Sequence, residues 1–188
     1  MTDLSTLTGT WTLDPAHTRL GFAAKHAMVT TVRGAFLDFE GTLHLDGERP
    51  ELSGAEVVIQ AASFDSGNTQ RDGHVRSADF LDVENHPTLT FRSSQVRVDG
   101  DEFVLVGDLT VRGTTRPVEI KGELEGTDKD PFGNQRVGFS GEAQISRKDF
   151  GLTWNVALES GGWLVSDKVK ITLDVSAVRQ EVPLKATA

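Results

Sequence analysis

The side chains of this chain best suited to acid–base or metal chemistry are its five histidines. They stand singly, at positions 17, 26, 44, 74 and 86, and no two have the close spacing of a metal-ligand pair. No Gly-x-Ser-x-Gly nucleophile motif and no phosphate-binding glycine loop follows a strand pattern. The chain contains no cysteine, which excludes disulfides and thiolate chemistry. The sequence therefore predicts no catalytic residue and no metal site.

Three polar side chains are candidates for contact with a bound molecule. His26 continues the apolar face of residues 20–26 and could point into an interior. Arg71 and Arg76 lie in a short predicted helix, from which they could pair with an anionic head group. The competing interpretations are a hydrogen-bonded core histidine and surface ion pairs. Trp154 and Trp163 lie on either side of two glycines, which is consistent with an aromatic loop near an opening or with core packing.

The stretch from residue 64 to residue 91 is the one part of the chain that does not alternate like a strand. Ser66 or Asn68 can cap the N-terminus of a helix. Gly73 weakens that helix, and Pro87 cannot continue it. We therefore predict one short helix near residues 67–80, which lies across an opening or an edge of the sheet.

The rest of the chain alternates with the period of β-strands. The clearest pattern is at residues 118–125, where every second residue is apolar or glycine and the others are charged. About eight such strands, separated by turn sequences such as Asp99-Gly100-Asp101, predict an all-β fold: an antiparallel sheet closed as a barrel or stacked as a sandwich. Gly41, Gly122 and Gly141 fall on the apolar side, and small inward residues favour a lumen.

Composition limits the functions that this chain can have. With 188 residues it fits one domain, and a net charge of −9 with a pI of about 5.0 argues against nucleic acid as a partner. No apolar run is long enough to span a membrane, and the N-terminus does not have the pattern of a signal peptide, so we expect a cytoplasmic location. We expect residues 1–9 to be an extension, residues 10–179 the domain, and residues 180–188 a tail.

Several separated blocks resemble the YceI-like family of bacterial polyisoprenoid-binding proteins. The main block runs from Arg71 to Asp82 and reads Arg-Asp-x-His-Val-Arg-Ser-x-Asp-Phe-Leu-Asp, and His86-Pro87 follows it. Trp11-x-Leu-Asp-x-x-His17, Gly107-Asp-Leu-Thr-Val-Arg-Gly-Thr114 and Ser146-Arg-x-Asp-Phe-Gly-Leu152 resemble other family segments. Together the blocks cover roughly residues 10–178. Two features depart from the family pattern: the absence of a secretory signal, and His86 in place of an aromatic residue.

The resemblance implies an extended, eight-stranded, lipocalin-like barrel with a helix near one end. It implies a hydrophobic tunnel that holds an isoprenoid chain, such as a quinone precursor or prenyl lipid, with no cofactor and no catalysis. The predicted tunnel residues are Phe22, Phe36, Phe39, Ile59, Phe80, Phe91, Leu105, Leu109, Ile120, Phe139, Ala143, Ile145, Phe150, Ile171 and Leu173. The predicted head-group residues are His26, Arg71, His74 and Arg76.

Two other functions remain open at this point. The first is an enzyme on the same barrel, acting on an amphipathic substrate with His26 or His74 as its acid–base group. The second is an interaction module, a homodimer whose barrel is filled by side chains. The first requires the histidine to face the lumen, and the second requires the lumen to be closed.

Overall fold

The computed structural model describes residues 4–181. Strands dominate it, as the alternating sequence predicts, and they are β1 (Gly9–Leu13), β2 (Arg19–His26), β3 (Thr30–Phe36), β4 (Phe39–Leu45), β5 (Gly54–Gln60), β6 (Phe64–Asp65), β7 (Thr88–Asp99), β8 (Glu102–Val111), β9 (Thr114–Lys129), β10 (Gln135–Ser146) and β11 (Val165–Arg179). The helical elements are η1 (Leu4–Leu7), η2 (Pro50–Leu52), η3 (Ala61–Ser63), α1 (Thr69–Arg76) and η4 (Arg147–Phe150).

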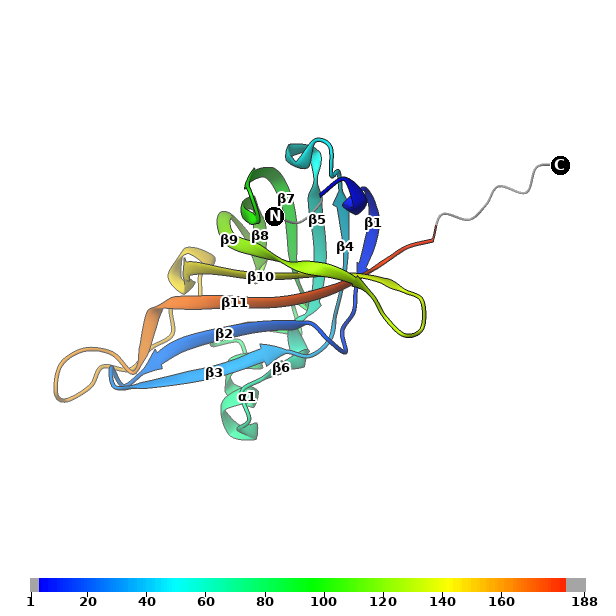
Figure 1. Ribbon diagram of the computed structural model, residues 1–188. Helices are drawn as coiled ribbons and strands as arrows, with labels where there is room; N and C mark the ends of the chain where they lie inside the picture. Colours follow the sequence, from blue (N-terminus) through cyan, green and yellow to red (C-terminus); the bar gives the residue numbers. More distant parts are fainter. Residues whose placement is uncertain (1–3, 182–188) are drawn as a thin grey trace.

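The strands close into an antiparallel barrel. The ring runs β1-β4-β5-β7-β8-β9-β10-β11 and is closed by pairing between β1 and β11, which makes it eight-stranded. β2, β3 and β6 extend this ring lengthwise, because β2 pairs with the first part of β11 and β3 pairs with both β2 and β6. Figure 1 shows that β10, β11, β2 and β3 cross β5 and β7 at a steep angle.

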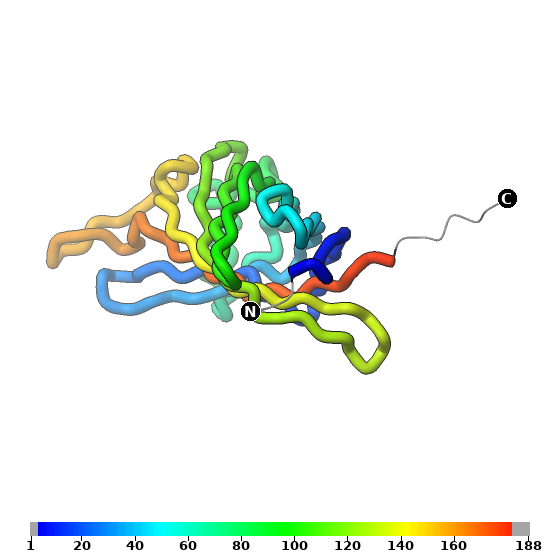
Figure 2. The backbone as a smooth tube through the Cα atoms, turned by 45° about the horizontal axis from the view of Figure 1, so that its top comes forward, coloured from blue at the N-terminus to red at the C-terminus, as the bar shows by residue number. Residues whose placement is uncertain are grey.

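The barrel has two ends with different structures. At the helix end lie α1, the segment 77–87 and the β8–β9 turn, together with the connection between β10 and β11. At the opposite end lie η1, the β4–β5 connection and the turns β7–β8 and β9–β10. Figure 2 shows two projections beyond the barrel: the β2–β3 hairpin with the β10–β11 connection on one side, and the β9–β10 hairpin on the other.

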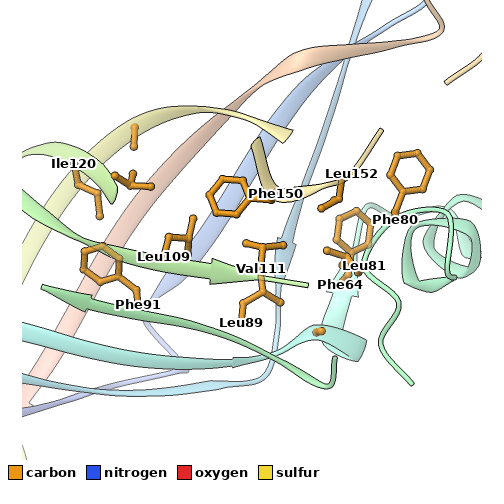
Figure 3. Packing of buried hydrophobic residues seen from close by; sticks show 13 residues of the cluster. Phe64, Phe80, Leu81, Leu89, Phe91, Leu109, Val111, Ile120, Phe150 and Leu152 are labelled. Atoms are coloured by element: carbon orange, nitrogen blue, oxygen red, sulfur yellow. The ribbon is translucent and has the colours of Figure 1, made fainter. Parts of the chain in front are cut away.

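The interior contains two clusters of buried apolar side chains. One lies toward the helix end, and Figure 3 shows its residues converging from several strands and from segment 77–87; they include Phe64, Phe80, Leu89, Phe91, Leu109, Ile120 and Phe150. The other lies toward the opposite end and includes Trp11, Leu13, Phe39, Val137 and Ala177. The indole N–H of Trp11 donates to the carbonyl of Leu7, so η1 packs against the second cluster.

The short helix lies where the sequence predicts it, with narrower bounds. α1 spans eight residues, Thr69–Arg76, and the side chain of Asn68 caps its N-terminus by accepting from the backbone N–H of Arg71. The helix ends at Ser77, whose N–H donates to the carbonyl of His74. The residues that follow, up to Pro87, form turns that return the chain to β7.

Two of the glycines on the apolar side do not leave open space. A Cβ atom at Gly122 would lie 2.3 Å from Cζ of Phe103, and one at Gly41 would lie 2.6 Å from Cδ1 of Leu13. Both glycines therefore accommodate a neighbouring side chain, contrary to the expectation of room at these positions. Gly141 differs from them because it lines the interior cavity.

Candidate functional site: an apolar cavity in the barrel

A cavity of about 410 Å³ occupies the interior of the barrel. It extends from the helix end, where Phe80 and Phe150 contribute to its wall, to the opposite end, where Pro50 and Val98 do. The walls are aliphatic and aromatic over most of this length, and the polar side chains among the lining residues are those of Asp46, Ser53, Asp101, Ser140 and Arg147. The barrel is therefore hollow over this length and is not filled by side chains.

Aromatic rings from three neighbouring strands form the wall near the helix end. The rings of Phe22 and Phe64 stack with centroids 4.7 Å apart, and Phe36 meets Phe64 edge-on at 5.7 Å. Gly34 makes this arrangement possible, because a Cβ there would lie 2.5 Å from Cζ of Phe22. A glycine in a strand commonly marks such a close approach.

The helix end of the cavity is closed by α1 and the segment after it. Val75 of α1 lines the cavity with Phe80 and Leu81, and the latter two are buried. On the outer side of this cap, the ring of His74 meets the ring of Trp154 edge-on at 4.5 Å, and the rings of Phe80 and Trp154 are 5.3 Å apart. The cap therefore joins α1 to the β10–β11 connection through contacts between aromatic rings.

A buried arginine forms part of the wall at this closed end. Arg147 is 4% exposed and lines the cavity. Its guanidinium donates hydrogen bonds to four backbone carbonyls, and it lies 5.9 Å from the ring centroid of Phe80; the four carbonyls belong to Leu152, Trp154, Val165 and Ser166. Burial lowers the pKa of Arg147 from its ordinary value, and the charge of nearby Asp167 opposes that shift.

The cavity opens at the opposite end of the barrel. Here its lining residues are half-buried or exposed, including Asp46, Ser53, Gly100 and Asp101, and Val98 is 39% exposed. Lining residues at the helix end are mostly buried. The opening therefore lies between the β4–β5 connection and the β7–β8 hairpin. The polar groups that line this mouth include two carboxylates and a hydroxyl, and no lysine or arginine of residues 4–181 lines it.

The sequence-predicted tunnel residues line the cavity with two exceptions, Phe39 and Ala143. Phe39 is the first residue of β4 and packs in the cluster that contains Trp11 and Val137. Ala143 carries only a methyl group and is buried among larger side chains of the first cluster. The alternation of a strand shows which face is inward, but it does not distinguish the cavity surface from the solid core beneath it.

None of the four predicted head-group residues lines the cavity. His26 is exposed because it is the last residue of β2, where the β2–β3 hairpin projects beyond the barrel. His74 lies outside the cap, 2.8 Å from a carboxylate oxygen of Asp79. α1 lies across the end of the barrel, and of its residues Val75 lines the cavity, whereas Arg71, His74 and Arg76 do not.

The two helix arginines instead tie α1 to the strand before it. Nε and Nη2 of Arg71 donate to the hydroxyl and the carbonyl of Ser66, at 2.6 and 2.8 Å. Nη2 of Arg76 donates to the carbonyl of Phe64, while its Nε is buried without a hydrogen-bond partner in the described part of the chain. Both arginines therefore stabilise the position of the cap.

Sequence reasoning missed Arg147, the one cation among residues 4–181 that lines the cavity. It follows β10 in η4, and nothing in its immediate pattern separates it from the exposed Lys148 beside it. The available signal is the apolar pair Phe150 and Leu152 just after it, which marks a segment that folds inward. Among residues 4–181, no group of three or more histidine, cysteine, aspartate or glutamate side chains could hold a metal ion. The same residues include no helix with the length and hydropathy to cross a bilayer.

Comparison with known proteins gives consistent matches along nearly the whole chain. The profile of the YceI-like domain matches residues 11–177. Protein YceI of Escherichia coli is 38% identical over 165 residues, which are 88% of this chain and 83% of that protein.

Solved structures share the fold. BcnA of Burkholderia cenocepacia superposes with a TM-score of 0.74 at 24% identity, over 87% of this chain and 98% of its own. A polyisoprenoid-binding domain of Saccharophagus degradans superposes with a TM-score of 0.65 at 15% identity, over 90% of this chain and 98% of its own. At these identities the likeness establishes the barrel and does not extend to the ligand.

Proposed function

This chain belongs to the YceI-like family, and from that premise we propose that it binds one long apolar lipid of the polyisoprenoid class inside its barrel. The observation that carries this proposal is the cavity of about 410 Å³ with nearly continuous apolar walls and one open end. Transfer of a hydrocarbon chain from water into such walls is favourable by about 25 cal/mol per Å² of apolar surface, before the costs of ordering. A polyisoprenoid-binding domain on the same fold is consistent with this ligand class.

The protein acts as a carrier or a sequestering protein, and the arrangement of polar groups favours this over catalysis. The two histidines considered as acid–base groups, His26 and His74, both lie outside the cavity. The serines that line it are Ser53 and Ser140, and no histidine of the described residues lines it beside them to act as a base. The amphipathic-substrate enzyme therefore has no observation in its favour.

The polar head of the ligand remains at the mouth and is neutral. Asp46 and Asp101 line the mouth, and the guanidinium of Arg49, which pairs with Asp46 at 3.5 Å, does not line it, so a phosphate there would meet carboxylates first. At the closed end, Arg147 already donates to four carbonyls, and a phosphate that reached it would lose its hydration along an apolar passage. An alcohol, phenol or quinone head needs only hydrogen bonds with the mouth residues.

The test is binding of a prenyl alcohol to lipid-free protein, with variants that fill the cavity. Gly141→Phe places a ring in the cavity, where a Cβ would already be 3.2 Å from Ile120 and 3.6 Å from Leu173. We expect it to weaken binding at least tenfold. Gln144→Phe, on the exposed face of the same strand, is the matched control and should bind like the parent. Ala143→Trp is unsuitable as a filling variant, because Ala143 is buried in the core without lining the cavity.

Native mass spectrometry of the gently purified protein would complete the test. A co-purifying prenyl lipid supports the proposal. Equal binding of the alcohol by Gly141→Phe and the parent, with the variant folded, would show that the lipid binds elsewhere. A matching prenyl diphosphate should bind no more tightly than the alcohol, at low salt or high. A large advantage for the diphosphate that salt removes would overturn the neutral head.

A further inference from the structure

Two segments project together from one side of the barrel (Figures 1 and 2). Exposed apolar side chains lie at their end. The segments are the β2–β3 hairpin and the β10–β11 connection, and their end is called the arm tip here. It consists of Met28, Val29, Val156 and Trp163, which are 64%, 76%, 46% and 53% exposed. Apolar side chains that are exposed together in one patch often mark an interaction site, whereas single exposed residues are common and need no explanation.

The arm tip has a defined conformation. The N–H of Ala27 donates to the carbonyl of Leu164 at 2.7 Å, which joins the two segments. The side chain of Asn155 binds both the N–H and the carbonyl of Val165, at 2.9 and 2.7 Å. Ala157 and Trp163 form a β-bridge. These bonds fix the tip as an extension of the sheet.

The turn of the hairpin is strained in a way that exposes an apolar residue. Ala27 and Met28 both have positive φ, 48° and 67°, and the N–H of Val29 donates to the carbonyl of His26. β-turns with positive φ at both central residues strongly favour asparagine and glycine, which tolerate positive φ. Alanine and methionine occupy this turn although neither favours positive φ, and the methionine is exposed at the end of the arm. Such outliers cluster at functional segments.

A group of cations lies just behind the tip, on the outer face of the sheet. Strand pairing places Lys25, Arg33 and Lys168 on that face, and all three are exposed. None of them has an ion pair among residues 4–181, whereas Lys170 on the same face pairs with Glu142. The connection itself contributes two carboxylates, Asp149 in η4 and Glu159. A cluster of free cations is notable in a chain with a net charge of −9.

We propose that the arm tip docks this protein on the surface of an anionic lipid membrane. Trp163, Met28 and the two valines would enter the interface between head groups and acyl chains, where tryptophan is favoured. Lys25, Arg33 and Lys168 would then lie near the head groups, where each cation strengthens attraction to anionic lipid. The arm thus combines the two signals, apolar and basic, that stable attachment to a surface requires.

A second copy of the chain fits this surface less well. A twofold contact between identical patches would bring the same three cations close to their own copies. Docking does not depend on what the cavity holds, so this inference can fail while the proposed function stands, and the reverse also holds.

The test is co-sedimentation of the full chain with two kinds of vesicle. One contains phosphatidylcholine alone, and in the other about three tenths of the lipid is phosphatidylglycerol. We expect binding to the anionic vesicles, weakened by salt, and little binding to the neutral ones. Replacing Met28 and Trp163 together by serine should lower binding at least tenfold, and Lys25→Gln should lower it about fivefold. Phe132→Ser is the matched control, because Phe132 is 89% exposed on the β9–β10 hairpin, on the other side of the barrel.

A second measurement reports insertion directly. Brominated lipid should quench the parent's tryptophan emission, and Trp163→Phe should remove most of that quenching while Trp11 and Trp154 remain. The circular dichroism spectrum and the thermal unfolding of the arm variants should match those of the parent, which shows that they fold. The proposal is overturned if the parent does not bind anionic vesicles, or if arm variants bind like Phe132→Ser. It is also overturned if the arm variants change only the molar mass measured by light scattering, which would assign the tip to a second copy.

Discussion

Arg147 connects the closed end of the cavity to the β10–β11 connection. Its guanidinium supplies hydrogen bonds to four carbonyls that lie apart in the sequence, two of them before the connection turns and two after it. A buried cation without a carboxylate within ion-pair distance is unusual, and here the backbone dipoles of the connection compensate its charge. The residue therefore acts on the shape of the cavity end, with most of its donors already in use.

We expect Arg147→Met to destabilise the protein by about 3 kcal/mol or more, because it leaves buried carbonyls without donors. The measurement is the free energy of unfolding in urea. Lys148→Met is the control, because Lys148 is the exposed neighbour on the same turn and should change the value by less than about 0.5 kcal/mol. Similar values for the two variants would mean that water replaces the guanidinium at those carbonyls.

A second arginine, Arg136, predicts a dependence of stability on pH. It lies 2.6 Å from Asp14 and 2.8 Å from Asp130. Its hydrogen bond is the largest cause of the lowered pKa of Asp14, and hydrogen bonds from Asn134 and then Arg136 lower the pKa of Asp130. A carboxyl whose pKa is lower in the folded state contributes stability above its unfolded pKa, near 3.8, and loses it as pH falls through the folded pKa.

Arg136→Gln should therefore reduce stability at pH 7 and have a smaller effect at pH 2, because the contribution of both carboxyls is progressively lost once the pH falls below their unfolded pKa, near 3.8. The midpoint of acid unfolding should move to higher pH, which circular dichroism across an acid titration would measure. Arg97→Gln is the control, since Arg97 pairs with Glu119 where both side chains are about half-exposed. An equal loss of stability at pH 2 and pH 7 would contradict the electrostatic explanation.

At the level of single residues, the sequence shows on which face of a strand a side chain lies, but not whether it reaches the cavity. Phe22, Ile120 and Leu173 could be assigned to the cavity because alternation places them inward. His26 has the same parity, yet it is exposed because it ends β2, in the hairpin that projects beyond the barrel. Arg147 could not be predicted, because its burial depends on carbonyls that only the folded connection brings together.

At the level of elements, α1 contains a glycine with no structural requirement. Gly73 lies inside the helix, and a Cβ added there meets no atom within 4 Å. Gly73→Ala should stabilise the protein by roughly 0.5–1 kcal/mol, because alanine loses less backbone entropy in a helix. Gly67, just before the helix, has φ +76° with the same open surroundings, so Gly67→Ala should destabilise instead. Urea unfolding of both variants tests the sign of each effect.

Gly73→Ala also tests whether α1 controls the release of lipid. Val75 of α1 and the following Phe80 close the cavity end opposite the mouth. If lipid leaves only through the mouth, Gly73→Ala should leave the release rate unchanged, as stopped-flow transfer to acceptor vesicles would measure. Slower release in this stabilised helix would show that lipid leaves through the helix end, which would make α1 a lid.

The positions of the strands and of the helix were largely predictable from the sequence, whereas the pairing between strands was not. Alternation located the long strands and the break at the helix, since a single strand with one face buried repeats every two residues. The sequence does not show that β1 and β2 both pair with β11, one after the other along its length. Nor does it show that β4 then pairs with β1 while β3 pairs with β2. These pairings depend on bends in the chain. Because of them, eight of the eleven strands form the closed ring and the other three extend it.

At the level of the whole molecule, closure of the sheet creates the cavity. An eight-stranded barrel is just wide enough to be filled by side chains or to hold one slender ligand. Here side chains fill the region around Trp11 and Val137 and leave the space between Phe91, Leu105 and Leu173. The barrel was predictable from the strand count and the family resemblance, whereas the position of the mouth depends on which connections cover which end.

The one-ended shape of the cavity predicts how affinity depends on the length of the ligand. Each methylene buried against the walls contributes about 0.8 kcal/mol, so two more carbons in a straight-chain alcohol should tighten binding roughly fifteenfold. This increase should stop when the chain reaches the closed end at Phe80 and Arg147, because further carbons would remain in water at the mouth. Titration calorimetry with a series of alcohols locates that length. In Gly141→Phe the plateau should come at a shorter chain, and in Gln144→Phe it should not move. Affinity that keeps rising with length in the parent would mean that the helix end is open to the chain.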